Sequence, residues 1–213
     1  MRSIVGVLVL LACTAWARCD HPYYPVREGW VWTYRSSADK NTYTIQTLEV
    51  KTNGFIQRFT FPSFGFDSRW ICDARGLTQP EFTQSGQSNM QMKFKTRKAS
   101  GVLLPQNLRV GSSWSYSYEV SGEAQQGNLT IELEQSIHTT SKAVGQESVS
   151  VPAGRFMALK VESTQTIRGT MKMGGRSSPM NLSVKSTSWY APNVGLVKSQ
   201  SEGVLIELVS LKR

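Results

Sequence analysis

Hydrophobic and polar residues alternate with a period of two along most of the chain after residue 20. The clearest runs are 90–95, 113–120, 129–134 and 180–185. This alternation is typical of antiparallel strands that have one buried and one solvated face. Apart from the N-terminus, no window has an apolar stripe at helical spacing. The pattern predicts an all-β protein of 12 or 13 antiparallel strands.

Turn residues fall between the predicted strands. Asn53-Gly54 predicts a two-residue hairpin, and the run GGRSSP at 174–179 is expected to separate two strands that carry methionines. The sheet is expected to be strongly curved, as a half-barrel or a barrel, because curvature protects the edge strands. The sequence leaves open whether the sheet closes.

One phrase occurs twice, as REGWVWTY at 27–34 and RVGSSWSY at 109–116. Gly29 and Gly111 are expected to turn the chain with positive φ before a strand. A second pair of phrases, WICDARGL at 70–77 and WYAPNVGL at 189–196, follows in the same order. We therefore predict one domain, residues 20–213, built from two related meanders at about 23–82 and 105–200.

The N-terminus resembles a secretory signal, with Arg2, an apolar run and then small residues. Two cleavage sites compete. Ala15-Trp16-Ala17 would remove residues 1–17, whereas Leu10-Leu11-Ala12-Cys13 resembles a lipobox that would remove 1–12 and lipidate Cys13. Either reading predicts export.

Cys19 and Cys72 remain in both cases, and an even pair of cysteines in an oxidising compartment predicts a disulfide. That bond would close a loop of about 50 residues and contribute about 3 to 4 kcal/mol.

The net charge of +9 is unevenly distributed, because residues 82–118 and 163–201 contain no acidic group. In an exported protein such segments would meet anionic lipids or acidic glycans, so we expect no nucleic-acid partner. Lys93, Lys95 and Arg97 share one side of a predicted strand. They either protect an edge strand from aggregation or contact an anionic membrane surface.

Candidate chemistry is sparse. Glu132, Glu134, Ser136 and His138 fall on one strand face, but such neighbours stand about 7 Å apart and cannot form a triad by themselves. The two glutamates could span a glycosidic bond, although carboxylates on a wet strand face are usually only solvated. His21 and His138 are too few for a typical zinc site. We expect no enzyme activity, metal or cofactor.

Several phrases together resemble a known group of proteins: YYP at 23–25, VPAGRFMALKV at 151–161 and WYAPNVGLVK at 189–198. They are similar to an uncharacterised family of exported bacterial all-β proteins, often lipoproteins, whose domain has no known function. More remotely, the chain resembles the half-barrels of the lipoprotein carriers LolA and LolB, but it lacks their helical lid pattern. The resemblance implies a periplasmic or outer-membrane location, with a lipid anchor as one form, and it supplies no catalytic residues.

The expected function is that of a non-enzymatic envelope protein. Its curved sheet would bind a lipid, a lipoprotein or another apolar ligand on a face lined by Trp32, Tyr34, Trp114, Tyr116, Trp189, Met90 and Met92. Methionines also fill gaps in packed cores, and that reading stays open. The alternative is an assembly component that binds a protein partner through its sheet edge, without a small ligand. The oligomeric state is left open.

Overall fold

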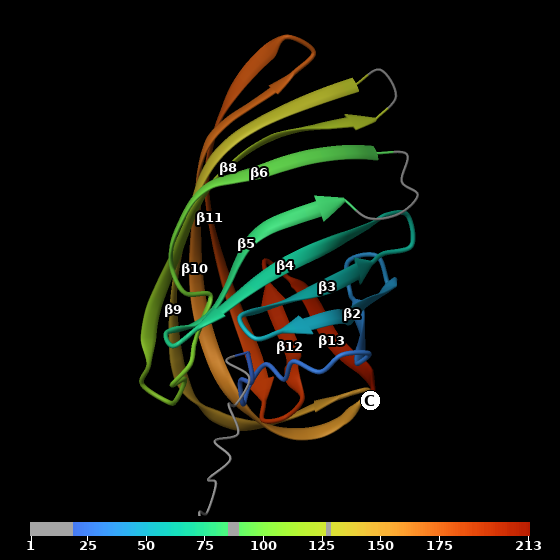
Figure 1. Cartoon of the computed structure of the whole chain (residues 1–213), viewed down its shortest axis with the longest axis vertical. Coiled ribbons are helices and arrows are strands. Elements are labelled where there is room, and N and C mark those ends of the chain that lie inside the picture. Colours follow the sequence, from blue (N-terminus) through green and yellow to red (C-terminus); the bar gives the residue numbers. More distant parts are fainter. Residues whose placement is uncertain (1–18, 85–89, 127–128) are drawn as a thin grey trace, which may run out of the picture.

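The computed structural model describes residues 19–84, 90–126 and 129–213, and Figure 1 shows the chain as one curved sheet. The signal segment and Cys13 lie outside these residues. The described part contains no helix, and therefore none that could cross a membrane. Its thirteen strands are β1 (Val31–Ser36), β2 (Thr42–Lys51), β3 (Gly54–Thr60), β4 (Gly65–Asp73), β5 (Gly76–Gln84), β6 (Met90–Gly101), β7 (Leu104–Pro105), β8 (Ser113–Gln126), β9 (Leu129–Val151), β10 (Gly154–Met173), β11 (Arg176–Ala191), β12 (Gly195–Ser201) and β13 (Val204–Lys212).

All thirteen strands belong to one antiparallel sheet in the order β6-β8-β9-β10-β11-β12-β13-β1-β2-β3-β4-β5-β7. The expected all-β class and strand number are confirmed. The two strands at the ends of this order, β6 and β7, are not paired with each other, so the sheet does not close into a barrel. β5 and β6 lie next to each other, yet no ladder joins them in the described residues.

The long strands β8 to β11 give the molecule its curvature. They arch from the top of Figure 1 to its base, where the β9–β10 hairpin curls beneath β12 and β13. A bulge between Lys160 and Val161 interrupts the β9–β10 ladder, and another between Trp189 and Tyr190 interrupts β11–β12. Because bulges increase bending and twist, they let such long strands wrap around a core.

The two copies of the repeated phrase form the same turn. Gly29 and Gly111 have φ of 81° and 88°. The Gly29 amide donates to Thr47 O, and the Gly111 amide to Ala143 O, each at 2.8 Å. In return Thr47 donates to Trp30 O at 3.1 Å, and Ala143 donates to Ser112 O at 2.9 Å. In each copy, these hydrogen bonds join the turn to the neighbouring strand, β2 or β9, just before β1 or β8 begins.

Two predicted hairpins differ in detail. In the β2–β3 hairpin Lys51 pairs with Gly54, so the two-residue turn is Thr52-Asn53 and Gly54 begins the next strand. A Cβ on Gly54 would lie 2.5 Å from Trp70 O, so the close approach of β4 requires glycine there. In the β10–β11 hairpin only Gly174 and Gly175 form the turn.

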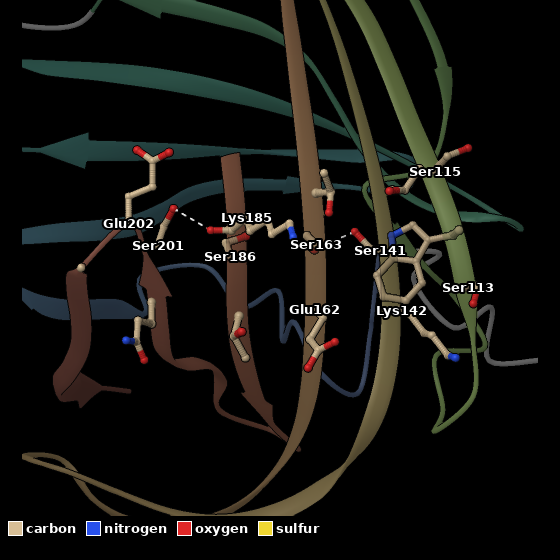
Figure 2. A pocket seen from close by; sticks show the side chains of 16 residues that line it. Ser113, Ser115, Ser141, Lys142, Glu162, Ser163, Lys185, Ser186, Ser201 and Glu202 are labelled. Carbon is tan, nitrogen blue, oxygen red and sulfur yellow. Dashed lines mark hydrogen bonds between the residues drawn. The ribbon is translucent and has the colours of Figure 1, made fainter. Parts of the chain in front are cut away.

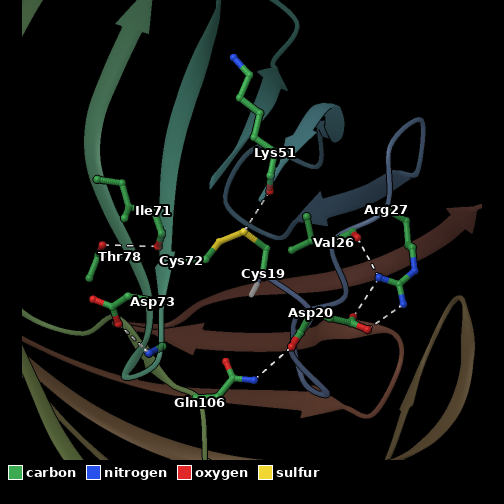
Figure 3. The surroundings of a disulfide bond; sticks show 11 residues. Cys19, Asp20, Val26, Arg27, Lys51, Ile71, Cys72, Asp73, Thr78 and Gln106 are labelled. Carbon is green, nitrogen blue, oxygen red and sulfur yellow. Dashed lines mark hydrogen bonds and ion pairs between the residues drawn. A yellow bond between two sulfur atoms is a disulfide. The ribbon is translucent and has the colours of Figure 1, made fainter. Parts of the chain in front are cut away.

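The segment before β1 crosses the base of the sheet and is held at several points. Cys19 forms the expected disulfide with Cys72 of β4 (Figure 3). His21 is 1 % exposed; its Nδ1 accepts from the Tyr23 amide at 3.1 Å, so Nε2 carries the proton donated to Pro105 O at 2.9 Å. Asp20 pairs with Arg27 at 2.9 Å. The segment is therefore part of the core.

The core consists of two neighbouring clusters. One surrounds the N-terminal segment and includes the disulfide, Phe55, Trp70 and Leu159. The other surrounds β1 and includes Trp32, Tyr34, Val197 and Leu208. Both lie at the base of the curved sheet, below the distal halves of β8 to β11.

Candidate functional site

An apolar cavity of about 270 Å³ lies against the concave face of the sheet, between the two core clusters. We call it the aromatic cavity. Its walls come from the N-terminal segment, from β1 to β5, from the residues before β7 and from the β11–β12 region. The lining residues are Tyr24, Pro25, Trp32, Tyr34, Tyr43, Ile45, Gln57, Phe59, Trp70, Gln79, Leu103, Tyr190, Gly195 and Leu196.

Hydrogen bonds fix most polar side chains of this wall. Tyr24 donates to Gln57 Oε1 at 2.6 Å, and Gln57 Nε2 donates to Thr47 Oγ1 at 3.3 Å. Trp32 Nε1 donates to Val194 O at 2.7 Å, and Tyr34 donates to Leu196 O at 2.9 Å. The last two bonds tie β1 to the turn before β12 and to the start of β12 itself. The wall is thus largely preorganised.

The cavity is a low-dielectric environment. Burial raises the pKa of Tyr43 to about 12 and raises the pKa of Tyr34 well above its ordinary value. Burial also raises the pKa of Tyr24 and of Tyr190. Among the described residues that line the cavity, none is acidic or basic. This wall suits an uncharged, mostly apolar group.

Aromatic rings continue from the cavity along β2 to β4. Tyr43 stacks on Tyr34 with ring centroids 5.4 Å apart and on Phe61 at 4.8 Å. Phe61 in turn stacks on Phe64 at 4.5 Å, and Phe66 stacks on Phe59 at 4.8 Å. Tyr34 is buried, and the other five rings are only partly buried. They extend the apolar wall beyond the enclosed cavity.

The distal half of the concave face is also apolar. Register and alternation place on it the inward-facing residues Tyr118, Val120, Ile131, Leu133, Ile137, Ile167, Met171, Met180 and Leu182, which we call the distal apolar surface. Leu182 is 49 % exposed, and Ile137 is buried. Large apolar side chains left open to solvent on a concave face are typical of ligand or partner binding.

The structure brings together part of the predicted aromatic face. Trp32 and Tyr34 line the cavity. Trp114 and Tyr116 lie on the same concave face outside it, where Trp114 Nε1 donates to Leu103 O and Tyr116 donates to Gln79 O, both at 3.0 Å. The two residues therefore link β8 to the far edge of the sheet. The side chains of Met90 and Met92 lie outside the described residues.

Trp189 does not share this face. Alternation along β11 directs Tyr190 into the cavity and turns Trp189 to the opposite side. There the ammonium groups of Lys160 and Lys198 lie 5.7 and 5.3 Å from its ring centroid, and its Nε1 donates to Glu147 at 2.6 Å. The prediction that Trp189 lines the ligand face is therefore wrong, and Tyr190 lies there instead. Because the two aromatic residues are adjacent, the sequence did not indicate which of them faces inward.

A larger, open depression is lined by residues of β8 to β12 and of the turn after β12 (Figure 2). Its charged side chains are Lys142, Glu162, Lys185 and Glu202, which balance one another in sign. Lys142 and Glu162 adjoin Ala143 and Val161 of the core, so alternation directs them outward. Ser141 and Ser163, which alternate with these two residues and face the other side, hydrogen bond to each other at 2.8 Å. This open, mixed surface selects no particular ligand.

The basic residues of β6 lie on an edge strand, as one of the two readings expected. Lys95 pairs with Ser121, and Arg97 forms an ion pair with Glu134 at 3.1 Å. The backbone of Lys93 pairs with that of Glu123, while its side chain lies outside the described part. Because acidic side chains neighbour these cations, edge protection accounts for them better than an anionic contact.

The strand face that carries Glu132, Glu134, Ser136 and His138 has a polar neighbour on β8 that the sequence spacing did not predict. Ser117 Oγ lies 2.6 Å from His138 Nδ1 on the exposed outer face. Glu134 pairs with Arg97, and Glu132 lies 3.5 Å from Lys172. No group of three candidate metal ligands occurs in the described residues. These pairs lie on an exposed surface.

Two solved structures match the fold of this chain. A candidate exported protein of Bacteroides fragilis with a YmcC-like fold matches with a TM-score of 0.54 and 15 % identity. A candidate lipoprotein of Parabacteroides distasonis matches with a TM-score of 0.53 and 18 % identity. Each alignment covers 91 % of this chain and 100 % of the relative. At this identity the match shows a shared fold.

No curated protein matches the sequence. A family model described as DUF3108-like matches residues 36–206, well over half of the chain. This confirms the expected place in an uncharacterised bacterial all-β family, whereas the remoter likeness to LolA and LolB stays a prediction. The chain belongs to the DUF3108-like family.

Proposed function

We propose that this protein binds a lipid acyl chain or a similar apolar ligand on the concave face of its sheet, and that it does so without catalysis. The observation that carries the proposal is the aromatic cavity, whose lining contains no charged residue among those described and whose wall continues into stacked, partly exposed rings. The enclosed part would hold one end of the ligand, and the distal apolar surface would cover the rest.

The proposed location is the bacterial cell envelope. The N-terminal sequence resembles an export signal, and the disulfide is typical of an oxidising compartment. Both solved relatives carry descriptions of that kind, one as a candidate exported protein and one as a candidate lipoprotein. We further propose that a lipid on Cys13 anchors the protein to a membrane of the envelope.

The test is native mass spectrometry of the full chain, purified after export in a bacterial host with an outer membrane, followed by organic extraction. A stoichiometric lipid supports the proposal. A second assay measures competition for a fluorescent fatty-acyl probe. Ile45→Trp, which fills the cavity, should abolish probe binding, whereas Ile56→Trp on the opposite face of the adjacent strand should not. A clean unliganded mass and equal probe binding by both variants would refute the proposal.

A second candidate function rests on the open sheet edges. Residues 78–84 of β5 and the whole of β6 each have a ladder on one side only, within the described part. A partner protein could add a strand to either edge. This reading predicts a stoichiometric protein in the same purification, with no extractable lipid.

A further inference from the structure

The distal end of the sheet leaves large apolar side chains open to solvent. Leu129 begins β9 and is 42 % exposed, and Met173 ends β10 and is 46 % exposed. Register pairs Met173 with Ile131, so Leu129, two residues before Ile131, lies on the same face of the neighbouring strand. These strand ends lie at the top of Figure 1, away from both core clusters. Exposed apolar side chains grouped at an extremity are typical of a contact surface.

The β10–β11 hairpin that carries Met173 is basic. Residues 163–201 contain no aspartate or glutamate. The distal half of the hairpin has four cations: Arg168, Lys172, Arg176 and Lys185. Lys172 lies 3.5 Å from Glu132 of β9 in an exposed pair, whereas the other three form no ion pair within the described part of the chain. At the tip, Lys172 precedes Met173 and Arg176 is paired with it across the ladder. Positive charge therefore adjoins the exposed apolar side chains.

This combination is complementary to the surface of an anionic bilayer. Lysine and arginine are attracted to anionic headgroups, and apolar side chains gain free energy when they leave water for the acyl region below. The backbone limits the depth. In the described part of the chain, residues 176–185 of β11 form a ladder with β10 alone. Unpaired backbone groups are not tolerated in hydrocarbon, so the hairpin must stay in the headgroup layer while its apolar side chains reach deeper.

We propose that the distal ends of β9, β10 and β11 dock on the surface of an anionic membrane. Leu129 and Met173 enter the acyl region, and Arg176 and Lys172 contact the headgroups. The inference goes beyond the proposed function, because it assigns a membrane contact that exists whether or not the aromatic cavity takes a ligand. In the docked state, the bilayer meets the open end of the distal apolar surface.

Vesicle binding by the full exported chain tests this proposal, with Cys13→Ser present throughout so that no lipid anchor contributes. The anionic vesicles contain phosphatidylethanolamine and phosphatidylglycerol, and the reference vesicles contain phosphatidylcholine alone. Leu129→Ser combined with Met173→Ser should weaken binding to the anionic vesicles by at least about tenfold. Arg176→Gln should weaken it about fivefold and should not affect the phosphatidylcholine vesicles. Added salt should weaken binding to the anionic vesicles.

Met157→Ser and Arg155→Gln are the matched controls, because both residues are exposed at the opposite end of β10 and Met157 is 61 % exposed. Neither should change binding.

A polarity-sensitive fluorophore gives a second readout. On Met173→Cys it should brighten with anionic vesicles and be quenched by nitroxide-labelled lipids, whereas on Met157→Cys it should do neither. Equal weakening by the control variants, a Met173 label that stays in water, or no binding to anionic vesicles would each overturn the docking proposal. The acyl-probe assay on the unaltered chain is independent of these outcomes, so failure of the proposed function is recognised separately.

Discussion

Gly29 and Gly111 offer a direct comparison between the two copies of the repeated turn. Both have positive φ, and a Cβ added at either would meet nothing within 4 Å. Gly29→Ala and Gly111→Ala should therefore each cost about 1 to 2 kcal/mol of unfolding free energy through backbone strain alone. Urea denaturation measures both.

Gly145→Ala is the matched control, because Gly145 lies in β9 without a positive φ and also has open space around its Cβ position. It should leave stability unchanged or raise it slightly. Costs that differ by more than about 1 kcal/mol between Gly29→Ala and Gly111→Ala would show that the two turns are not equivalent.

His21 should make stability depend on pH. Burial lowers its pKa below the ordinary value, so the unfolded chain binds a proton at a higher pH than the folded chain does. The stabilisation is complete above about pH 6.5 and is lost as the pH falls, by up to about 1.4 kcal/mol per pH unit. Asp20, paired with Arg27, opposes the shift only in part.

Urea denaturation between pH 8 and pH 5 measures this loss. His21→Gln, which keeps a donor and an acceptor, should flatten the pH dependence. His138→Gln removes the other histidine, which is exposed, and should keep the wild-type dependence. Equal slopes in the two variants would rule out His21 as the source.

Alternation predicted the direction of an aromatic side chain only where its neighbours along the chain are small or polar. Trp32, Tyr34, Trp114 and Tyr116 each alternate with small or polar neighbours, and all four lie on the concave face. Trp189 is followed by Tyr190, so alternation alone could not decide between them. The lysines that cover Trp189 come from β10 and β12, and only the register reveals them.

The disulfide is the covalent link among the several contacts that hold the N-terminal segment. The disulfide joins it to β4 across a sequence separation of 53. Replacing both cysteines, as Cys19→Ser with Cys72→Ser, should lower the free energy of unfolding by about 3 to 4 kcal/mol. Denaturation with and without reductant measures this. Reductant should destabilise the wild-type protein to the level of the double variant and should not affect that variant.

A hydrogen bond from Tyr116 of β8 to the backbone of Gln79 in β5 joins two strands that are not neighbours in the sheet. Tyr116→Phe removes the donor to Gln79 O and should cost about 1 kcal/mol, with faster hydrogen exchange at the Leu103 amide, which donates to Leu77 O nearby. Tyr118→Phe, two residues along the same strand face, is the control and should be nearly neutral. Equal exchange in the two variants would show that this hydrogen bond does not hold the edges together.

At the scale of the whole molecule, a ligand should raise thermal stability. A probe such as methyl octanoate at 100 times its Kd should stabilise the folded state by about 2.7 kcal/mol and raise Tm by about 5 to 10 °C. Ile45→Trp should show no shift, since its cavity is filled. A rise of equal size in that variant would place binding elsewhere.

The overall architecture was predictable only in part. Period-two alternation specifies strands, and Gly29 and Gly111 mark where two of them begin. The period-two alternation carries no information on the order of strands in the sheet, so the sequence could not show that β6 and β7 form the edges. The cavity depends on long-range contacts, such as Trp32 with Val194, that link residues 162 positions apart. Such contacts leave no local pattern.

The disulfide also sets how far the molecule could stand from a membrane. A lipid on Cys13 would be separated from the pinned Cys19 by about six residue steps, which span at most about 20 Å. So short a tether would hold the base of the sheet against the bilayer. The distal ends of β8 to β11, at the top of Figure 1, would then project away from it. An anchored protein of this shape would hold the aromatic cavity, at the base of the sheet, close to its own bilayer and would turn the distal apolar surface towards a partner or an opposing membrane.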